Sequence, residues 1–360
     1  MMKHHLIFYA ACLGMLVSTL PASAESFFPR LGGDVILRLG YDDVYNAQAP
    51  LTESDDIFGV MIASPELHFG DRLMLGSEIR YEGLLPPSDD RFFEDEGFFL
   101  RELFVRYDLT EDLTLQVGKY APSFALASLV TPGMYGNNYN KEIELIDRIG
   151  ATAEHEFDLG SGGNHVLSAS AFFEDTSILS QSLGYRRGIK KRSDGGPSNT
   201  ESFESFALSV QGSDIEALPG FTYKLGVLHQ ARGVDGVADE NGFSLSAVQT
   251  LGLGEDRSLT LIGEVAPIWN FDGTEDDIIY SSLGAAYGVG PWAFVVTGTS
   301  RRRTLSGGGR FDDYNLQTSM IYNLGYGFTL DLAHEFLRDR NRNSRRIGFR
   351  FSKQFFFDGD

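Results

Sequence analysis

The sequence lacks cysteine outside its first residues, because its single cysteine, Cys12, lies in an apolar N-terminal stretch. Lys3 precedes that stretch, and Ala22-Ser23-Ala24 follows it with the small residues of a cleavage site, which is typical of a secretory signal peptide. We therefore expect a cleaved signal over residues 1–24 and a single mature domain over residues 25–360. An exported chain without disulfides must be held by packing or by a closed hydrogen-bond network.

Positive charge and long apolar runs are also scarce. The chain has 30 Lys and Arg against 50 Asp and Glu, a formal net charge of −20. Nucleic-acid binding needs a basic footprint, so we expect no nucleic-acid partner. After the signal, no apolar run approaches the roughly twenty residues that a membrane helix needs. A membrane β-barrel remains compatible, because half of each barrel strand faces a polar lumen.

Motifs for catalysis, cofactors and metals are missing as well. The five mature histidines are scattered along the chain, and no H-E-x-x-H, G-x-S-x-G or phosphate-loop pattern occurs. We therefore predict a protein that is not an enzyme and that uses no cofactor or metal. Catalytic triads assemble from distant residues, so a barrel enzyme stays open as a less favoured alternative.

The sequence is rich in short stretches in which apolar and polar residues alternate. Residues 105–120, VRYDLTEDLTLQVGKY, show two such stretches around the acidic turn Thr110-Glu111-Asp112, which predicts a hairpin with one apolar and one polar face. The same reading predicts about sixteen strands in all. They are 33–43, 56–69, 72–83, 98–109, 113–121, 147–158, 165–175, 203–212, 221–231, 242–252, 257–268, 277–288, 291–301, 313–323, 327–337 and 345–357.

The connections between these strands alternate in length. Short ones such as 70–72, 110–112 and 254–256 are each followed by a longer one. The long connections are 44–55, 84–97, 122–146, 176–202, 232–241, 269–276, 302–312 and 338–344. This alternation predicts an all-β transmembrane antiparallel barrel of about 16 strands, with short periplasmic turns and long external loops. A secreted propeller is disfavoured because no blade motif recurs, whereas a non-channel anchor or adhesin barrel remains an alternative.

Residues 100–150 resemble a known family of outer-membrane proteins. The segments are RELFV (101–105), LQVGKYAPSF (115–124) and DRIG (147–150), which resemble the phosphate/polyphosphate-selective (O/P-type) porins of Gram-negative bacteria. Ser123 interrupts the Pro-Phe pair of that family, and Ala125 replaces its glycine. The resemblance implies a sixteen-stranded, usually trimeric diffusion channel in the bacterial outer membrane, with a third external loop that folds inward.

Residues 121–147 are the candidate for that inward-folded constriction loop. Its apolar part, 124–130, suits the barrel wall, and its later part carries Lys141, Glu142 and Glu144. The strand residues in the lumen-facing phase are the other pore-lining candidates. They are Arg38, Glu78, Arg80, Glu102, Arg106, Asp108, Lys224, Glu264, Asp331, Glu335 and Arg350. Acidic residues outnumber basic ones in the lumen phase, so we expect weak cation selectivity, with an anion- or phosphate-selective pore as the alternative.

Three of the predicted external loops are basic, at residues 186–192, 301–310 and 338–346. The simplest interpretation is that they form solvated loop tips, and the sharper one is that they meet lipopolysaccharide phosphates or gather anionic solutes. The expected protein is thus an outer-membrane porin for passive diffusion of ions and small hydrophilic solutes. Its expected partners are outer-membrane lipid, lipopolysaccharide and two further copies of itself in a homotrimer.

Overall fold

The computed structural model describes residues 29–49, 53–85, 89–185 and 187–358, so the predicted signal peptide lies outside the described residues. Its main feature is a closed antiparallel β-barrel of 16 long strands. The wall strands are β1 (Arg30–Tyr45), β2 (Ser54–Phe69), β3 (Leu73–Gly83), β5 (Glu96–Asp108), β6 (Leu113–Tyr120), β7 (Arg148–Asp158), β8 (Asn164–Glu174), β10 (Ser205–Ser213), β11 (Phe221–Gln230), β12 (Glu240–Gly252), β13 (Arg257–Trp269), β14 (Asp277–Val289), β15 (Trp292–Thr304), β16 (Arg310–Gly325), β17 (Phe328–Asp339) and β18 (Arg342–Asp358).

Neighbouring wall strands are consecutive along the chain, and the last strand closes the sheet on the first. Strand β18 pairs with β1 from Gly32↔Asp358 to Tyr45↔Arg345. Every predicted strand corresponds to a wall strand, with ends that differ by a few residues. The predicted fold class is therefore confirmed. Two further strands of two residues each, β4 (Arg91–Phe92) and β9 (Leu183–Gly184), lie in the long connections.

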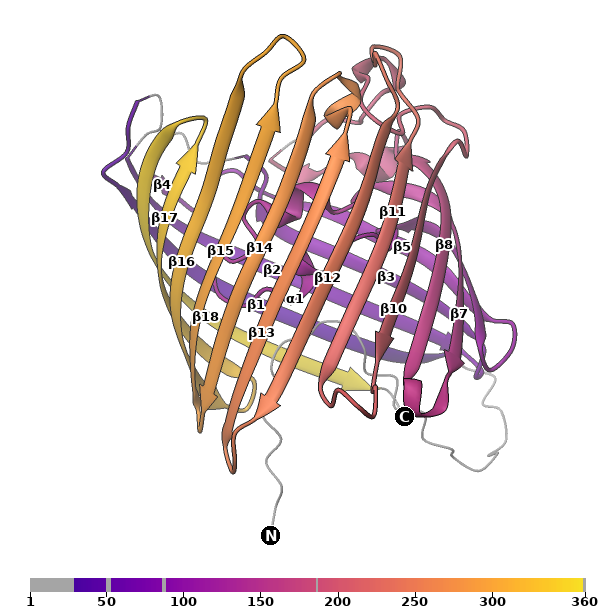
Figure 1. Cartoon of the computed structure of the whole chain (residues 1–360), viewed down its shortest axis with the longest axis horizontal. Helices are drawn as coiled ribbons and strands as arrows, with labels where there is room; N and C mark the ends of the chain where they lie inside the picture. Colours follow the sequence, from indigo (N-terminus) through magenta and orange to yellow (C-terminus); the bar gives the residue numbers. More distant parts are fainter. Residues whose placement is uncertain (1–28, 50–52, 86–88, 186, 359–360) are drawn as a thin grey trace.

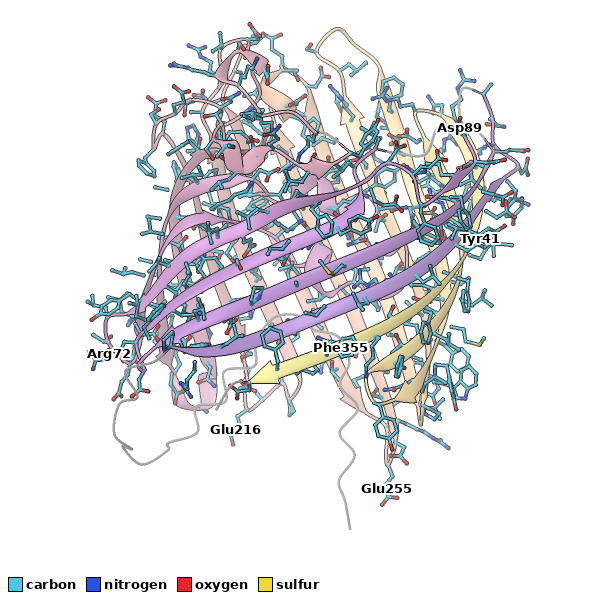
Figure 2. The ribbon with its side chains drawn as sticks, turned by 180° about the vertical axis from the view of Figure 1, so that it is seen from behind. Tyr41, Arg72, Asp89, Glu216, Glu255 and Phe355 are labelled. Carbon is cyan, nitrogen blue, oxygen red and sulfur yellow. The ribbon has the colours of Figure 1, made fainter. Side chains whose placement is uncertain are left out.

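The two ends of the barrel differ in their connections. Arg72, Glu216 and Glu255 mark short turns at one end, whereas Asp89 lies in a long connection at the other (Figure 2). In Figure 1 the strands β10–β16 stand steeply, and β1, β2, β3 and β5 cross behind them at a shallow angle. No helix in the described part of the chain is long and apolar enough to cross a membrane.

Two of the predicted long loops are shorter than expected. Strand β15 continues to Thr304 and β16 begins at Arg310, while β17 and β18 are joined by Arg340-Asn341 alone. Both residues of this turn have positive φ, at 46° and 63°, as a tight hairpin turn requires. The strands here extend beyond the apolar part of the wall, where outward side chains can be polar. The arginines that we assigned to these loops therefore lie largely on strands.

The outer surface of the barrel is apolar. On β1, Leu37 and Leu39 are exposed, whereas Arg38 between them points to the other face and is half-buried. In the hairpin that ends β5 and begins β6, Val105, Leu115 and Val117 are likewise exposed on the outside. All the described strands belong to one sheet, so no second sheet covers these leucine and valine side chains, and the apolar face of each strand is the outer face of the barrel.

Candidate functional site: the barrel lumen

Residues 121–147, here called the inward segment, leave the wall at the end of β6. The segment contains two short helices, α1 (Ala127–Val130) and η1 (Asn140–Ile143), and Figure 1 shows α1 behind β13, inside the ring of strands. Strand β6 ends at Tyr120, while its partner β5 continues beyond the pairing of Leu103 with Lys119. Residues 96–102 of β5 therefore have no β6 partner on that side, because the chain turns inward after Tyr120.

The connection 175–204 occupies the position that the inward segment leaves open in the wall. Its short strand β9 pairs with Gly97 and Phe98 of β5. The Arg187 guanidinium lies 5.1 Å from the centre of the Phe99 ring. This arrangement supplies the unpaired upper edge of β5 with hydrogen bonds, as a sheet edge within a closed barrel requires.

A buried ionic cluster fixes the two ends of the inward segment. The Lys119 ammonium group has no exposed surface and lies 2.9 Å from Asp147 and 2.8 Å from Asp175. Its third donor reaches the carbonyl of Leu179 at 2.9 Å. Lys119 is the last residue but one of β6, and Asp147 directly precedes β7, so the cluster ties the start of the segment to its end and to the connection 175–204.

The apolar part of the inward segment packs on one side of the lumen. Phe124 is 2% exposed and belongs to a buried cluster with side chains of β8, β10, β11, β13 and β14. Gly226 of β11 permits this approach, because a Cβ there would overlap the backbone carbonyl of Phe124. That carbonyl accepts a hydrogen bond of 2.7 Å from the Ser244 hydroxyl. This side of the lumen is therefore a packed core.

Glu264 of β13 caps the start of α1. Its Oε2 accepts hydrogen bonds from the backbone N–H groups of Leu126 at 2.8 Å and Ala127 at 2.7 Å, and from the Ser246 hydroxyl at 2.7 Å. A carboxylate that accepts several N–H bonds is held strongly at the N-terminal end of a helix. Glu264 was predicted to line the pore; it does point inward, but it is buried beneath the segment.

The middle of the inward segment is clamped by side chains of β16 and β1. Gln317 accepts the Tyr135 N–H at 2.8 Å and donates to the Pro132 carbonyl at 2.8 Å. The Tyr135 hydroxyl donates to Asp42 of β1 at 2.5 Å. A single amide side chain thus satisfies one donor and one acceptor of a backbone that has no strand partner.

The polar end of the segment is bonded to the wall and does not stand free in the lumen. Arg301 of β15 holds Glu142 at 2.7 Å, Asp313 at 2.7 Å and Asp339 at 2.5 Å, and its guanidinium lies 4.6 Å from the centre of the Tyr139 ring. Three further contacts fix the same end. They are Tyr280 to Glu142 at 2.8 Å, Ser282 to Asn140 at 2.5 Å and Arg101 to Glu144 at 2.6 Å.

The predicted pore-lining residues divide into three groups. Lys141, Glu142 and Glu144 lie on the inward segment; Lys141 and Glu142 are exposed and Glu144 is half-buried. Four others are buried on the wall: Lys224, Glu264, Asp331 and Glu335. Lys224 donates to Ser123 and Glu335 accepts from Asn138, so both hold the inward segment, and Asp331 pairs with Arg350 at 2.9 Å. The remaining residues are half-buried on the inner wall: Arg38, Glu78, Arg80, Glu102, Arg106, Asp108 and Arg350.

We call the inner faces of β1, β2, β3 and β5 the open sector. Glu78 and Glu102 lie directly opposite each other across β3 and β5. Like charges in that position repel, and two arginines compensate them, since Arg80 lies 2.5 Å and Arg101 lies 3.4 Å from Glu78. Among the ion-paired side chains here, the most exposed are carboxylates, with Glu66 43% and Asp108 41% exposed, against 21% for Arg106.

Sequence alternation missed several residues that hold the lumen together. Arg101 lies at a β-bulge, where the β3–β5 register shifts between Glu78 and Ile79, so the alternation places it outside although it bonds inward to Glu144. Arg301 was assigned to an external loop. Asp42 continues the inward alternation of Arg38, and that signal would have found it.

Outside the wall strands, Asp276 joins two neighbouring connections. It accepts the Ser306 N–H at 2.9 Å and pairs with Arg303 at 2.8 Å. The Ser306 hydrogen bond, and after it the Arg303 guanidinium, hold the pKa of Asp276 below its usual 3.8. Within the described residues, no group of three or more metal-ligating side chains comes together.

No protein-family model and no curated protein matches the sequence. Solved structures do match in fold. The outer-membrane channel DcaP of Acinetobacter baumannii aligns with TM-score 0.56 and 12% identity over 91% of this chain and 97% of its own. OmpT of Vibrio cholerae, in a trimer form, gives 0.54 and 10% over 91% and 100%. OpdK of Pseudomonas aeruginosa gives 0.51 and 10% over 91% and 99%. The chain therefore has the fold of outer-membrane barrels.

Proposed function

We propose that the protein is a bacterial outer-membrane porin, a water-filled channel for passive diffusion of ions and small hydrophilic solutes. The observation that carries this proposal is the asymmetry of the lumen. The inward segment packs mainly against β8–β17, with further bonds to Asp42 of β1 and Arg101 of β5, whereas most charged side chains of β2, β3 and β5 remain half-buried on the opposite wall. A barrel that served only as an anchor would have no need of a segment packed mainly on one side of the lumen and a charged wall on the other.

The selectivity that we propose is a weak preference for cations, because the most exposed of the ion-paired charges in the open sector are carboxylates. The resemblance of residues 100–150 to phosphate-selective porins supports the alternative, an anion-selective pore. A homotrimer agrees with that resemblance and with the trimer form of the similar OmpT structure. The signal over residues 1–24 and the location in the outer membrane belong to the same proposal, with lipid and lipopolysaccharide around the barrel.

The decisive experiment is to refold the protein into planar bilayers and record single-channel currents in a salt gradient, with and without phosphate. We expect steady conductance steps and a reversal potential of the sign that cation preference gives. A folded barrel without steps would contradict the channel and favour an anchor. Anion preference that strengthens with phosphate would contradict only the selectivity.

A further inference from the structure

Strand β2 carries apolar side chains on both faces over residues 57–63, where the sequence is Ile-Phe-Gly-Val-Met-Ile-Ala. Directly paired residues of an antiparallel ladder share a face, and Val60 is paired with Arg38 of β1. Asp42, which lies further along the same face of β1, bonds to the inward segment, so this face is the lumen side. The lumen-facing side chains of β2 here are therefore Phe58, Val60 and Ile62.

These three side chains, here called the apolar track, do not belong to the packed core on the other side of the lumen. Inward apolar residues such as Leu228 and Ile278 are 2% and 1% exposed in that core. Phe58, Val60 and Ile62 are only half-buried. Apolar surface left accessible beside charged lumen side chains suits contact with an apolar group.

Two glycines of the inner wall show where the aromatic rings of Phe58 and Phe104 lie. A Cβ at Gly40 would overlap the Phe58 ring, and one at Gly76 would lie 2.6 Å from Cζ of Phe104. Since the Cβ of an inward residue points into the lumen, both rings lie on the lumen side, flat against the wall. Each ring therefore presents a face to whatever passes, and Phe104 repeats on β5 the arrangement of Phe58 on β2.

Charged groups border the apolar track on both sides. On one side, Val60 is paired with Arg38 of β1. On the other side, Ile62 is paired with Arg80 of β3. Arg80 is itself held by Glu78 at 2.5 Å and lies 3.8 Å from Glu82. Guanidinium donors and carboxylate acceptors thus stand beside an apolar surface, which matches a solute with both kinds of group.

We propose that the apolar track is a binding path for amphipathic solutes, which join an apolar ring or alkyl group to a hydroxylated group, as an aryl glycoside does. This inference rests on the proposed channel function and names the solute class for it. The ring would stack on Phe58 and pack on Val60 and Ile62. The hydroxyl groups would bond to the bordering arginines and glutamates.

The test titrates the single-channel current with phenyl β-glucoside and with methyl β-glucoside. A pore that only sieves by size disfavours the bulkier phenyl β-glucoside. The apolar track instead predicts that phenyl β-glucoside blocks the current at about fivefold lower concentration than methyl β-glucoside does. Phe58→Ser should abolish this difference, and Phe58→Tyr, which keeps the ring, should retain it. Gln116→Ala, a lumen substitution on β6 away from the track, is the matched control and should also retain it.

Equal block by the two glucosides in the wild type would overturn the proposal, as would a preference that survives Phe58→Ser. Should Phe58→Ser fail to fold, Val60→Thr keeps a β-branched side chain of the same shape and should still weaken the phenyl preference. Absence of any conductance would overturn the channel itself. Normal conductance without a phenyl preference would overturn the apolar track alone, so the two failures are distinguishable.

Discussion

Arg301 is the side chain whose removal should most clearly release the inward segment. It bonds to Glu142 of the segment and to two wall carboxylates, Asp313 and Asp339, while only 16% of its side chain is exposed. In Arg301→Met, these three carboxylates lose their common cation and repel one another. Breaking a buried pair by removing one partner costs about 3–5 kcal/mol. Partial exposure places this site near about 3 kcal/mol, which raises the undocked fraction of the segment about a hundredfold.

Arg302, the next residue of β15, provides the matched control. It pairs with Asp312 at 2.8 Å on the outer face, and these side chains are 55% and 46% exposed. Surface pairs of this kind contribute less than about 1 kcal/mol. Arg302→Met removes the same charge from the same strand, and it should leave the inward segment docked.

Hydrogen–deuterium exchange measures the release directly. Amides of η1, such as Glu142 N–H bonded to the Tyr139 carbonyl at 3.1 Å, should exchange about a hundredfold faster in Arg301→Met than in Arg302→Met. The amides of β15 should remain protected in both variants, which shows that the barrel is intact. Equal exchange over residues 137–144 in the two variants would refute the claim that Arg301 anchors the segment.

Three further predictions concern single side chains of the wall and the connections. Glu264→Gln should weaken docking of the inward segment by about 1–3 kcal/mol, because a charged hydrogen-bond acceptor at the start of α1 becomes a neutral one. Faster hydrogen exchange of the Leu126 and Ala127 amides measures this loss. Gly40→Ala should lower the urea midpoint by the equivalent of about 1–3 kcal/mol through overlap with the Phe58 ring. Gly298→Ala, whose Cβ would meet no atom within 3.8 Å, should leave the midpoint unchanged. The pKa of Asp276 is depressed on folding, so its contribution is present above pH 3.8 and is lost as the pH falls through the folded value. The difference in unfolding midpoint between wild type and Asp276→Asn should therefore close below that pH.

The wall of this barrel is predictable from sequence because its strands carry apolar side chains on the outer face and mostly polar ones on the inner face. Period-two alternation reports which side a residue takes, and it assigns Arg106 inward and Val105 outward as the structure has them. It also identifies the sixteen strands, since each is bounded by turn residues. It fails at Arg101, where a bulge adds one residue and reverses the phase.

Alternation cannot tell which inward side chains meet water. Glu264 and Glu82 have the same sequence pattern, yet one is 7% exposed beneath the inward segment and the other is 31% exposed on the open sector. The difference is set by where residues 121–147 dock, which depends on contacts with strands more than a hundred positions away. Such long-range contacts leave no periodic signal in either partner.

Docking of the inward segment also determines which charged side chains of the lumen remain accessible. A backbone that crosses a barrel has no strand ladder to join, and each buried N–H or C=O left unpaired costs about 1–3 kcal/mol. Here Glu264, Gln317 and Ser244 satisfy several of these groups. Their polarity is therefore explained by docking, and a count of all inward charges overstates what a passing ion meets. Ion preference should follow the open sector alone, where Glu66 and Asp108 are the most exposed of the ion-paired charges. Removing their carboxylates should therefore shift the reversal potential, whereas Glu264→Gln should not.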